Sequence, residues 1–259
     1  MNGVVKYKNM TQYKALVFDL DGTATATKFE SLPSSAIIEA VQKAKEKVFV
    51  SVATGRQYAG ALRIINTLNI TNPSIFYGGS QIVKPLTNEV LWKQEIPVDT
   101  VKKILDIGKN YPYKFIFSGS YERFLPTERK ATSSESIIYI MDVEKENIQA
   151  ILSELNKIEL IAANKTNSWK DGCQDIHITH RDATKKNAMH HLLEILGVNK
   201  QEVIVIGDSS NDLPLFENGG LKVAMGNGTP DIKAKADFIT LDLQHDGLAY
   251  AIEKFILNS

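Results

Sequence analysis

The sequence predicts an α/β protein: a Rossmann-like, doubly wound, mostly parallel sheet with an α+β domain inserted into it. Two observations carry this prediction. Apolar runs of strand length alternate with helix-like stretches at both ends of the chain, which is the pattern of right-handed β-α-β crossovers. Between these ends, strands with alternating apolar and polar residues are typical of an antiparallel sheet with one open face.

The N-terminal half of the predicted core begins with a strand at 15–19 and a helix at 33–45, whose apolar residues recur at helical spacing after a Pro-Ser-Ser start. A strand at 48–53 follows. The helix-like stretch 57–69 then leads to another strand at 74–79. Strands separated by helices in this way predict parallel pairing.

The C-terminal half repeats this order. Its strand at 202–208 contains "VIVIG", a wholly apolar run that suits a sheet covered on both faces. The other predicted elements are a helix at 185–197, a helix after "SSNDLPLFENGG", strands at 221–226 and 236–240, and a last helix at 247–257.

The middle of the chain predicts the inserted domain. It combines two helix-like stretches, at 97–111 and 143–157, with strands at 114–118, 136–143, 158–164 and 174–180. We therefore expect a discontinuous core formed by residues 1–82 and 178–259, and an inserted domain formed by residues 83–177.

Composition narrows the function classes. The chain of 259 residues is 43% hydrophobic, and its 30 Lys and Arg balance its 30 Asp and Glu. No stretch joins basic residues with aromatics, so a nucleic-acid partner is not expected. The N-terminus lacks a signal-peptide pattern and no apolar run has membrane-spanning length, so we expect a cytoplasmic protein with no membrane partner. The single cysteine, Cys173, can form no internal disulfide.

Carboxylates follow two of the apolar strands. These are Asp19 and Asp21 in "VFDLDGT", and Asp208 and Asp212 in "IVIGDSSND". Ligands of open α/β sheets bind at the carboxyl ends of the strands, where carboxylates gathered together would repel one another. A hard cation removes this repulsion, and Mg²⁺ prefers oxygen ligands that it shares with a substrate phosphate. The sequence therefore predicts a Mg²⁺ site at this edge of the sheet.

Phosphate-binding groups are predicted at the same edge. Thr54 and Gly55 follow the strand at 48–53 and offer a hydroxyl and backbone N–H groups. Lys185 opens the helix that leads to the strand at 202–208, and its ammonium would neutralise both an aspartate and a phosphate.

Taken in chain order, these stretches resemble the haloacid dehalogenase (HAD) superfamily. The matching motifs are "LVFDLDGT" at 16–23, "VSVATGR" at 50–56, Lys185 in "ATKKNAM", and "IVIGDSSND" at 204–212. The insert lies where this superfamily places its C2-type cap, and the tail with "GDSSNDLPLF" and "VAMGN" is similar to the Cof-type branch with a type IIB cap. The resemblance implies a Mg²⁺-dependent phosphatase that acts on a small phosphorylated metabolite, above all a sugar phosphate, as a monomer or small homo-oligomer.

The resemblance also implies residue roles. Asp19 matches the nucleophile and Asp21 the general acid and base. The positions matching phosphate contacts are Leu20 through its backbone N–H, Thr54, Gly55, Lys185 and Asn211. The positions matching the metal site are Asp19, Asp21, Asp208 and Asp212.

Two departures from the family pattern leave the substrate open. Gly78-Gly79-Ser80 replaces a common Asn-Gly-Ala, and Lys186 stands where Gly often follows the lysine. Candidate specificity residues in the insert are Tyr121, Arg123, Trp169, Lys170 and His177. The histidines, including His180, His190 and His191, are expected to serve ordinary packing or surface roles, since no pair has the spacing of a zinc helix motif.

Three other functions are compatible with parts of this pattern. A phosphomutase of the phosphomannomutase type has a similar core and cap but returns the phosphoryl group to the sugar. A catalytically inactive sugar-phosphate-binding relative would keep the fold, although here every chemical position is filled. A receiver-type signalling domain is about half this length and places its aspartates before the Thr and the Lys, which disfavours it.

Overall fold

The computed structural model describes residues 13–26, 31–168 and 170–258. The chain divides into two compact units. The first unit consists of Met1–Val52, Arg63–Asn72 and Leu192–Ser259, and the second of Ala53–Leu62 and Pro73–His191. This division into units does not test the predicted domain limits at residues 82 and 178, which stay a prediction.

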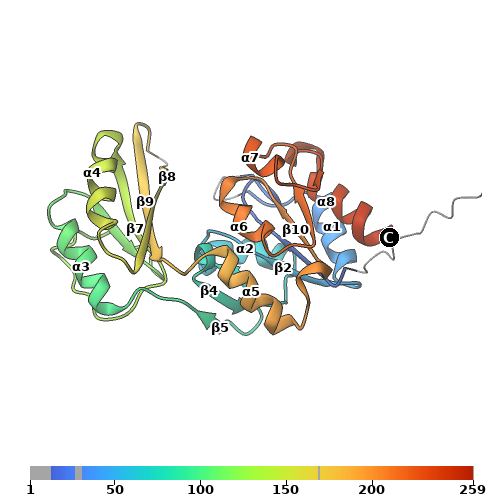
Figure 1. The fold of residues 1–259 in the computed structure, drawn as a ribbon, viewed down its shortest axis with the longest axis horizontal. Coiled ribbons are helices and arrows are strands. Elements are labelled where there is room, and N and C mark those ends of the chain that lie inside the picture. Colours follow the sequence, from blue (N-terminus) through green and yellow to red (C-terminus); the bar gives the residue numbers. More distant parts are fainter. Residues whose placement is uncertain (1–12, 27–30, 169, 259) are drawn as a thin grey trace, which may run out of the picture. The chain divides into compact units, whose positions relative to one another are not determined.

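The first unit is built on a five-stranded parallel sheet (Figure 1). Strands β1 and β10 form its centre and are buried along their whole length. This confirms the predicted parallel α/β core. In spatial order the strands are β12 (Phe238–Ile239), β11 (Leu221–Ala224), β10 (Val203–Gly207), β1 (Ala15–Phe18) and β2 (Phe49–Val52).

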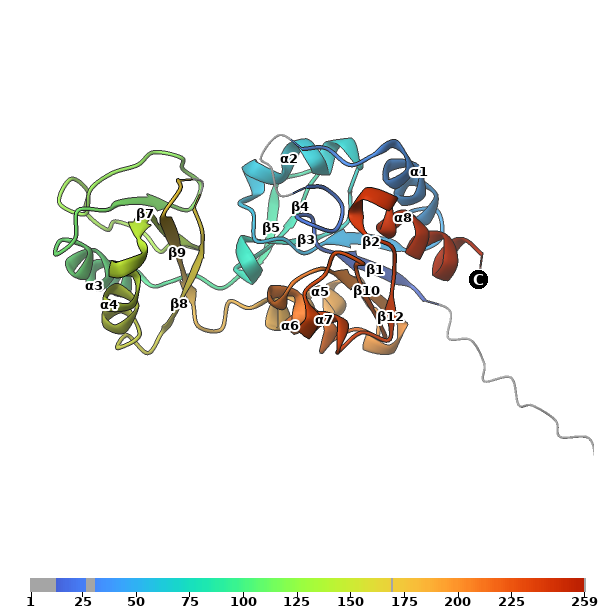
Figure 2. The same cartoon turned by 90° about the horizontal axis from the view of Figure 1, so that it is seen from above.

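Helices cover both faces of this sheet (Figure 2). On one side α1 (Ser35–Ala44), capped by the Ser34 side chain, packs against α8 (Gly247–Ile252). On the other side lie α6 (Leu213–Phe216) and α7 (Pro230–Lys233), which are single turns. The remaining turns are 3-10 helices at Lys200–Glu202, Ser210–Asp212 and Leu243–His245, and a π-helical end at Glu253–Leu257.

Helices α2 (Tyr58–Thr67) and α5 (Lys185–Leu196) run from one unit into the other along the chain. The second unit contains an antiparallel sheet in the order β3 (Ser74–Phe76), β4 (Gln81–Lys84) and β5 (Glu89–Lys93), with a 3-10 turn at Tyr77–Gly79 between the first two strands. Strands β4 and β5 were not predicted, because both are short and the turn between them contains no Gly.

The second sheet of this unit has the antiparallel pairing that was predicted for the inserted α+β segment. Its strands are antiparallel, in the order β6 (Lys114–Phe117), β7 (Ile138–Glu144), β9 (Cys173–His180) and β8 (Ile161–Asn167). Helices α3 (Val98–Gly108) and α4 (Lys145–Leu155) belong with it. Strand β8 starts later than predicted, because the Ile158 N–H still donates to the Leu155 carbonyl at the end of α4.

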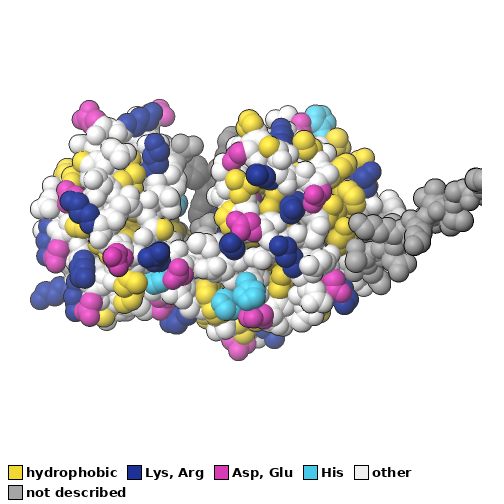
Figure 3. Space-filling model, viewed as in Figure 1, with side chains coloured by type: hydrophobic (Ala, Val, Ile, Leu, Met, Phe, Trp, Pro, Cys, Tyr) yellow, Lys and Arg dark blue, Asp and Glu magenta, His cyan; other side chains and the backbone are white. Residues whose placement is uncertain are grey.

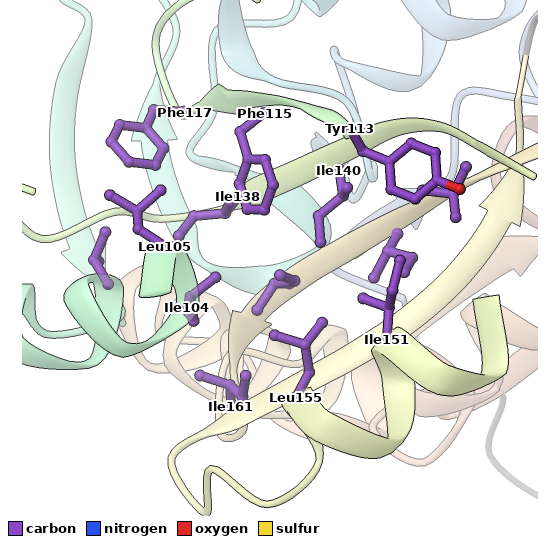
Figure 4. Packing of buried hydrophobic residues seen from close by; sticks show 14 of the residues in the cluster. Ile104, Leu105, Tyr113, Phe115, Phe117, Ile138, Ile140, Ile151, Leu155 and Ile161 are labelled. Carbon is purple, nitrogen blue, oxygen red and sulfur yellow. The ribbon is translucent and has the colours of Figure 1, made fainter. Parts of the chain in front are cut away.

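Buried aliphatic and aromatic side chains from α3, α4 and all four strands point toward one another and form the core of this layer (Figure 4). Alternate strand residues lie in this core, so the residues between them face the opposite side of the sheet. Labelled members of the core include Ile104, Leu105, Phe115, Phe117, Ile138, Ile140, Ile151 and Leu155.

Basic and acidic side chains are interspersed on the face drawn in Figure 3 rather than gathered by sign, in keeping with the zero net charge. Among the residues that the structure describes, no helix combines the length and the apolar character needed to cross a bilayer.

Candidate active site

The two aspartate motifs of the first unit emerge from neighbouring strands. Strands β1 and β10 pair in parallel with Phe18 opposite Ile206, so the residues after them leave the same edge of the sheet. The Asp19 N–H continues this ladder by donating to the Ile206 carbonyl at 3.1 Å. Parallel pairing therefore brings residues 19 and 208 together although they are far apart in the sequence.

Three carboxylates converge at this edge. Asp19, Asp208 and Asp212 each place one oxygen so that all three oxygens lie within 4.8 Å of one another. Asp19 and Asp212 are buried, at 4% and 0% exposure, where mutual repulsion of like charges is costly. An all-oxygen donor set of this kind fits Mg²⁺. The fourth predicted metal residue, Asp21, is not in this group, and its metal role stays a prediction.

Backbone geometry fixes the second aspartate motif. Asp212 Oδ2 accepts hydrogen bonds from the N–H groups of Asp208 at 3.1 Å and Ser209 at 3.3 Å. A Cβ on Gly207 would lie 2.6 Å from the Asp212 Cβ, so only glycine fits before Asp208. The Ser209 hydroxyl donates to Asn211 Oδ1 at 2.8 Å and orients the carboxamide that was predicted to bind phosphate.

The first motif forms a tight turn after β1. The Leu20 carbonyl accepts from the N–H groups of residues 23, 24 and 25, and Gly22 has a φ of +82°. A side chain on Gly22 would collide with the Asp208 carboxylate, and Thr23 Oγ1 donates to Asp208 Oδ1 at 3.3 Å. Thr23 was not among the predicted site residues, since its only signal in the sequence is its place in "DGT".

In the second unit, Thr54 is fully buried within a network of backbone contacts. Its N–H donates to the Ile75 carbonyl at 2.9 Å, and its carbonyl accepts from the Gly78 N–H at 3.1 Å. Its hydroxyl accepts from the Arg56 N–H at 3.1 Å. The loop is thus held in one shape. Around Gly55 the space is open, with no atom within 4 Å of a Cβ built on it.

Lys185 is 4% exposed at the start of α5. Gly79, with a φ of +114°, packs directly on the peptide that joins Thr184 to Lys185. A Cβ on Gly79 would lie 2.6 Å from the backbone nitrogen of Lys185. Glycine at position 79 lets the start of α5 approach, but it matches the Gly of the common Asn-Gly-Ala, so this contact does not explain the departures at Gly78 and Ser80. Lys186, the other departure, is exposed.

The predicted specificity residues of the insert differ in their surroundings. Tyr121 is 57% exposed, and Arg123 forms an ion pair with Asp142 at 2.6 Å. Lys170 is exposed, and Trp169 lies outside the described residues. His177 lies in β9, on the side of the sheet away from the core of Figure 4.

His177 belongs to a row that crosses all four strands of its sheet. The strand register places Ile116, Tyr139, His177 and Asn164 opposite one another. The rings of Tyr139 and His177 meet edge to face with centroids 4.7 Å apart, and Thr166 Oγ1 lies 3.3 Å from His177 Nε2. We call Ile116, Tyr139, His177 and Asn164 the cross-strand row.

The two titratable residues of this row, Tyr139 and His177, are uncharged at neutral pH. Burial lowers the pKa of His177 from 6.5 to about 4, so the imidazole is neutral at pH 7. Burial also raises the pKa of Tyr139, against the hydrogen bond with the Gln57 side chain, which lowers it. The row therefore offers neutral donors and acceptors.

Gln57 links this face to the Thr54 loop within the second unit. It is 8% exposed, and its Oε1 accepts from the Gly119 N–H at 3.2 Å while its Nε2 donates to the Ser120 carbonyl at 3.5 Å. Gln57 stands only three residues after Thr54. Sequence reasoning missed it, because a glutamine after "TGR" carries no signal of its own.

The other singled-out residues have structural surroundings. His180 is buried, with Nδ1 3.1 Å from Gln94 Nε2, and His191 stacks on Trp92 with ring centroids 4.7 Å apart. His190 is exposed, and Cys173 is a buried free thiol.

Comparison with known proteins assigns the family. The model of the haloacid dehalogenase-like hydrolases matches residues 16–252. The chain belongs to this family. The match confirms the resemblance drawn from the four motifs, and with it the assignment of the chain as a hydrolase of the phosphatase type.

Relatives of this hydrolase cover nearly all of its length. It is 27% identical to 5-amino-6-(5-phospho-D-ribitylamino)uracil phosphatase YcsE of Bacillus subtilis, over 94% of this chain and 96% of the relative. A solved haloacid dehalogenase-like hydrolase from Bacteroides thetaiotaomicron is 25% identical, with a TM-score of 0.78 over 94% of this chain and 99% of that one. A subclass IIB sugar phosphatase shares the fold at 22% identity, with a TM-score of 0.75 over 93% of this chain and 98% of that one.

Proposed function

We propose that this hydrolase is a Mg²⁺-dependent phosphatase that cleaves a sugar or polyol phosphate monoester through an aspartyl-phosphate. The observation that carries the proposal is the convergence of the Asp19, Asp208 and Asp212 carboxylates, which belong to the "FDLDGT" and "GDSSND" motifs at the ends of β1 and β10. Two buried carboxylates and a half-buried third this close together are suited to a cation and, through it, to phosphate chemistry.

In the proposed reaction, a carboxylate oxygen of Asp19 attacks the phosphorus in line, and the bond from phosphorus to the sugar oxygen breaks. Asp21 gives its proton to the leaving alkoxide. Asp21 then takes a proton from a water molecule, whose oxygen attacks the aspartyl-phosphate. Inorganic phosphate leaves, and Asp19 is again a free carboxylate while Asp21 is again protonated.

The remaining residues position the phosphoryl group. We assign its contacts to the Leu20 and Gly55 N–H groups, the Thr54 hydroxyl, the Lys185 ammonium and the Asn211 carboxamide. Mg²⁺ would be held by Asp19, Asp208 and Asp212, and when bound it offsets negative charge on the transferring group. Lys185 is 4% exposed, and its ammonium would offset negative charge on a substrate phosphate.

The neutral cross-strand row supports an uncharged, hydroxyl-rich leaving group. Tyr139, His177 and Asn164 can exchange hydrogen bonds with sugar hydroxyls, whereas a second anionic group would find no cation among them. Two relatives point the same way, since one is named for a phosphorylated ribityl compound and another as a sugar phosphatase. We therefore retain residues 83–177 as a cap that selects the substrate.

A panel of phosphate esters assayed with Mg²⁺ and with a chelator tests the proposal. We expect release of inorganic phosphate from at least one sugar or polyol phosphate, without a bisphosphate activator, and loss of this activity on chelation. Transfer to a second position of the sugar without phosphate release would identify a phosphomutase instead. If no ester is hydrolysed in either condition, the proposal fails.

Metal binding has a readout that does not depend on activity. Mg²⁺ should raise the melting temperature of the wild-type protein by mass action, because it binds the folded state. Asp208→Asn should weaken this effect, whereas Asp237→Asn, an exposed carboxylate that accepts from the Lys222 N–H, should leave it intact. Equal Mg²⁺ effects in all three proteins would remove the metal from the proposal.

A further inference from the structure

Asn227 joins the "FDLDGT" turn to two other segments of the first unit. It follows β11 in "VAMGN", and its side chain makes two hydrogen bonds to backbone. Its Nδ2 donates to the Gly22 carbonyl at 2.8 Å, and its Oδ1 accepts from the Leu243 N–H at 2.9 Å. One carboxamide thus connects the turn after β1, the turn after β11 and the start of the 3-10 helix Leu243–His245.

The hydrogen bond between Asn227 and Gly22 lies where the "FDLDGT" turn changes direction. Gly22 has a φ of +82°, and its N–H donates to the Thr25 carbonyl at 2.7 Å. The other groups of the turn bond inward to the Leu20 carbonyl. The Gly22 carbonyl instead accepts from Asn227, so the orientation of the Gly22–Thr23 peptide, one residue beyond Asp21, depends on a side chain from another segment.

The backbone on both sides of Asn227 is hydrogen-bonded. On one side the Gly226 N–H donates to the Leu241 carbonyl at 2.9 Å, while Lys233 Nζ donates to the Gly226 carbonyl at 2.6 Å. On the other side the Gly228 N–H donates to the Met225 carbonyl at 2.9 Å. The next residue, Thr229, donates its N–H to the Asp208 carbonyl at 2.8 Å, so the same turn also touches the backbone of the metal motif.

We propose that Asn227 is a positioning residue that fixes the direction in which Asp21 presents its proton to the leaving group. The inference rests on the proposed function, in which Asp21 is the general acid. Asn227 touches no reacting atom. Its effect is transmitted through the Gly22 peptide, which sets the backbone on the C-terminal side of Asp21.

This role makes a specific prediction about leaving groups. An alkoxide is a poor leaving group and needs a well-placed proton donor, whereas a nitrophenolate leaves as a stabilised anion and needs little protonation. A misdirected Asp21 should therefore slow alkyl esters selectively. A loss of stability alone would lower the turnover of both esters by the same factor.

The experiment compares kcat/KM for the best sugar phosphate of the ester panel with that for p-nitrophenyl phosphate. In Asn227→Ala we expect the sugar phosphate value to fall by at least about tenfold more than the aryl value, within the range that general acid catalysis contributes. Asn227→Asp keeps an acceptor for Leu243 but loses the donor to Gly22, so it should show the same selectivity even if the alanine variant folds poorly.

Asn199→Ala is the matched control. Asn199 is also an exposed asparagine of the first unit whose carboxamide is hydrogen-bonded, in this case to Glu202 Oε2 at 3.2 Å, and it should show no selectivity. Equal losses for both esters in the Asn227 variants, or no loss for either, overturn the inference. If the wild-type protein hydrolyses neither ester, the inference falls together with the proposed function, and that failure appears in the wild type rather than in the variants.

Discussion

The carboxylate site of the first unit and the cross-strand row of the second unit are built in opposite ways. Asp19 and Asp208 directly follow paired strands, and the backbone holds Asp212 through two N–H groups. Tyr139 and His177 come from the middle of separate strands and are placed by side-chain contacts and strand register. The first arrangement is encoded in short contiguous motifs, whereas the second depends on the whole sheet.

Under the proposed function, this difference would separate reaction chemistry from substrate choice. Strand pairing fixes the geometry of the motif-encoded site. Few substitutions fit there, because glycines such as Gly207 leave no space for another side chain. A residue in the row can be replaced without disturbing a turn or a backbone hydrogen bond, so the row is free to vary with the substrate. Substitutions in the two regions should therefore affect different kinetic constants.

Asp19→Asn should have the largest effect. It removes the proposed nucleophile while keeping the side-chain shape, so we expect kcat for every ester to fall by at least about 10³-fold, as when other covalent nucleophiles are removed. Asp237→Asn, which changes an exposed carboxylate, should keep the wild-type kcat. Steady-state phosphate release measures both, and ordinary turnover by Asp19→Asn would contradict the proposed mechanism.

The cross-strand row should carry an acid-sensitive part of the stability. Burial lowers the pKa of His177 to about 4 from 6.5. Above pH 6.5 both folded and unfolded chains hold a neutral imidazole. As the pH falls below 6.5, His177 takes up a proton in the unfolded chain but stays neutral in the folded chain. This difference lowers the free energy of unfolding by about 3 kcal/mol by pH 4.

Urea unfolding of His177→Gln at pH 7 and pH 4 measures this contribution. The variant should lose less stability between the two pH values than the wild type does, by about 3 kcal/mol. His190→Gln changes an exposed histidine of the same unit and should follow the wild type. Parallel pH dependence in all three proteins would mean that His177 is not protected from protonation.

A pair of neighbouring glycines tests how strictly a motif position is determined. Gly79→Ala introduces a Cβ that collides with the peptide between Thr184 and Lys185, at a φ of +114°. Gly78→Ala also stands at positive φ, +67°, but meets no atom within 4 Å. We expect Gly79→Ala to cost about 2 kcal/mol more stability than Gly78→Ala, which carries the backbone strain alone.

Kinetics should separate these variants further, because Gly79 supports the start of α5. Gly79→Ala should raise KM for the phosphate ester through the displaced Lys185, whereas Gly78→Ala should leave KM near the wild-type value. Equal unfolding free energies and equal KM values for the two variants would show that the close approach at Gly79 is unimportant.

Much of the carboxylate site could be predicted from the sequence, because its residues sit at strand ends that parallel pairing brings together. The contact of Asn227 with Gly22 joins residues 205 positions apart, and no local pattern specifies it. The row of Tyr139 and His177 depends on the register of β7 against β9, which includes an irregularity after Ile140 that the alternation of side chains does not reveal.

The elements of the fold also differ in how well local sequence patterns predict them. Elements with strong periodicity, such as α1 and β10, were predicted close to their observed limits. Strands β4 and β5 were missed because their stability comes from pairing with each other and with β3 rather than from a long apolar run. Local patterns predict what a segment can form, whereas pairing decides which short segments do form it.

Tyr139→Phe should have the smallest effect, and the most selective one. Removal of the hydroxyl takes away its hydrogen bond with the Gln57 side chain and the proposed hydrogen bond to the substrate. The latter is worth about 1 kcal/mol, so KM for a sugar phosphate should rise by about fivefold. KM for p-nitrophenyl phosphate, which has no sugar hydroxyls, should stay the same. Neither ester should lose kcat, because Tyr139 takes no part in the proton transfers assigned to Asp21.

The matched control is Tyr113→Phe in the same unit. Tyr113 is buried, its hydroxyl donates to Glu144 and accepts from Asn147 Nδ2 at 2.7 Å, and its loss should reduce stability while leaving both KM values unchanged. A rise in KM for both esters in Tyr139→Phe would mean that this hydroxyl supports the fold rather than the substrate. The cross-strand row would then resemble the motif-encoded site, and the separation of chemistry from substrate choice would not hold.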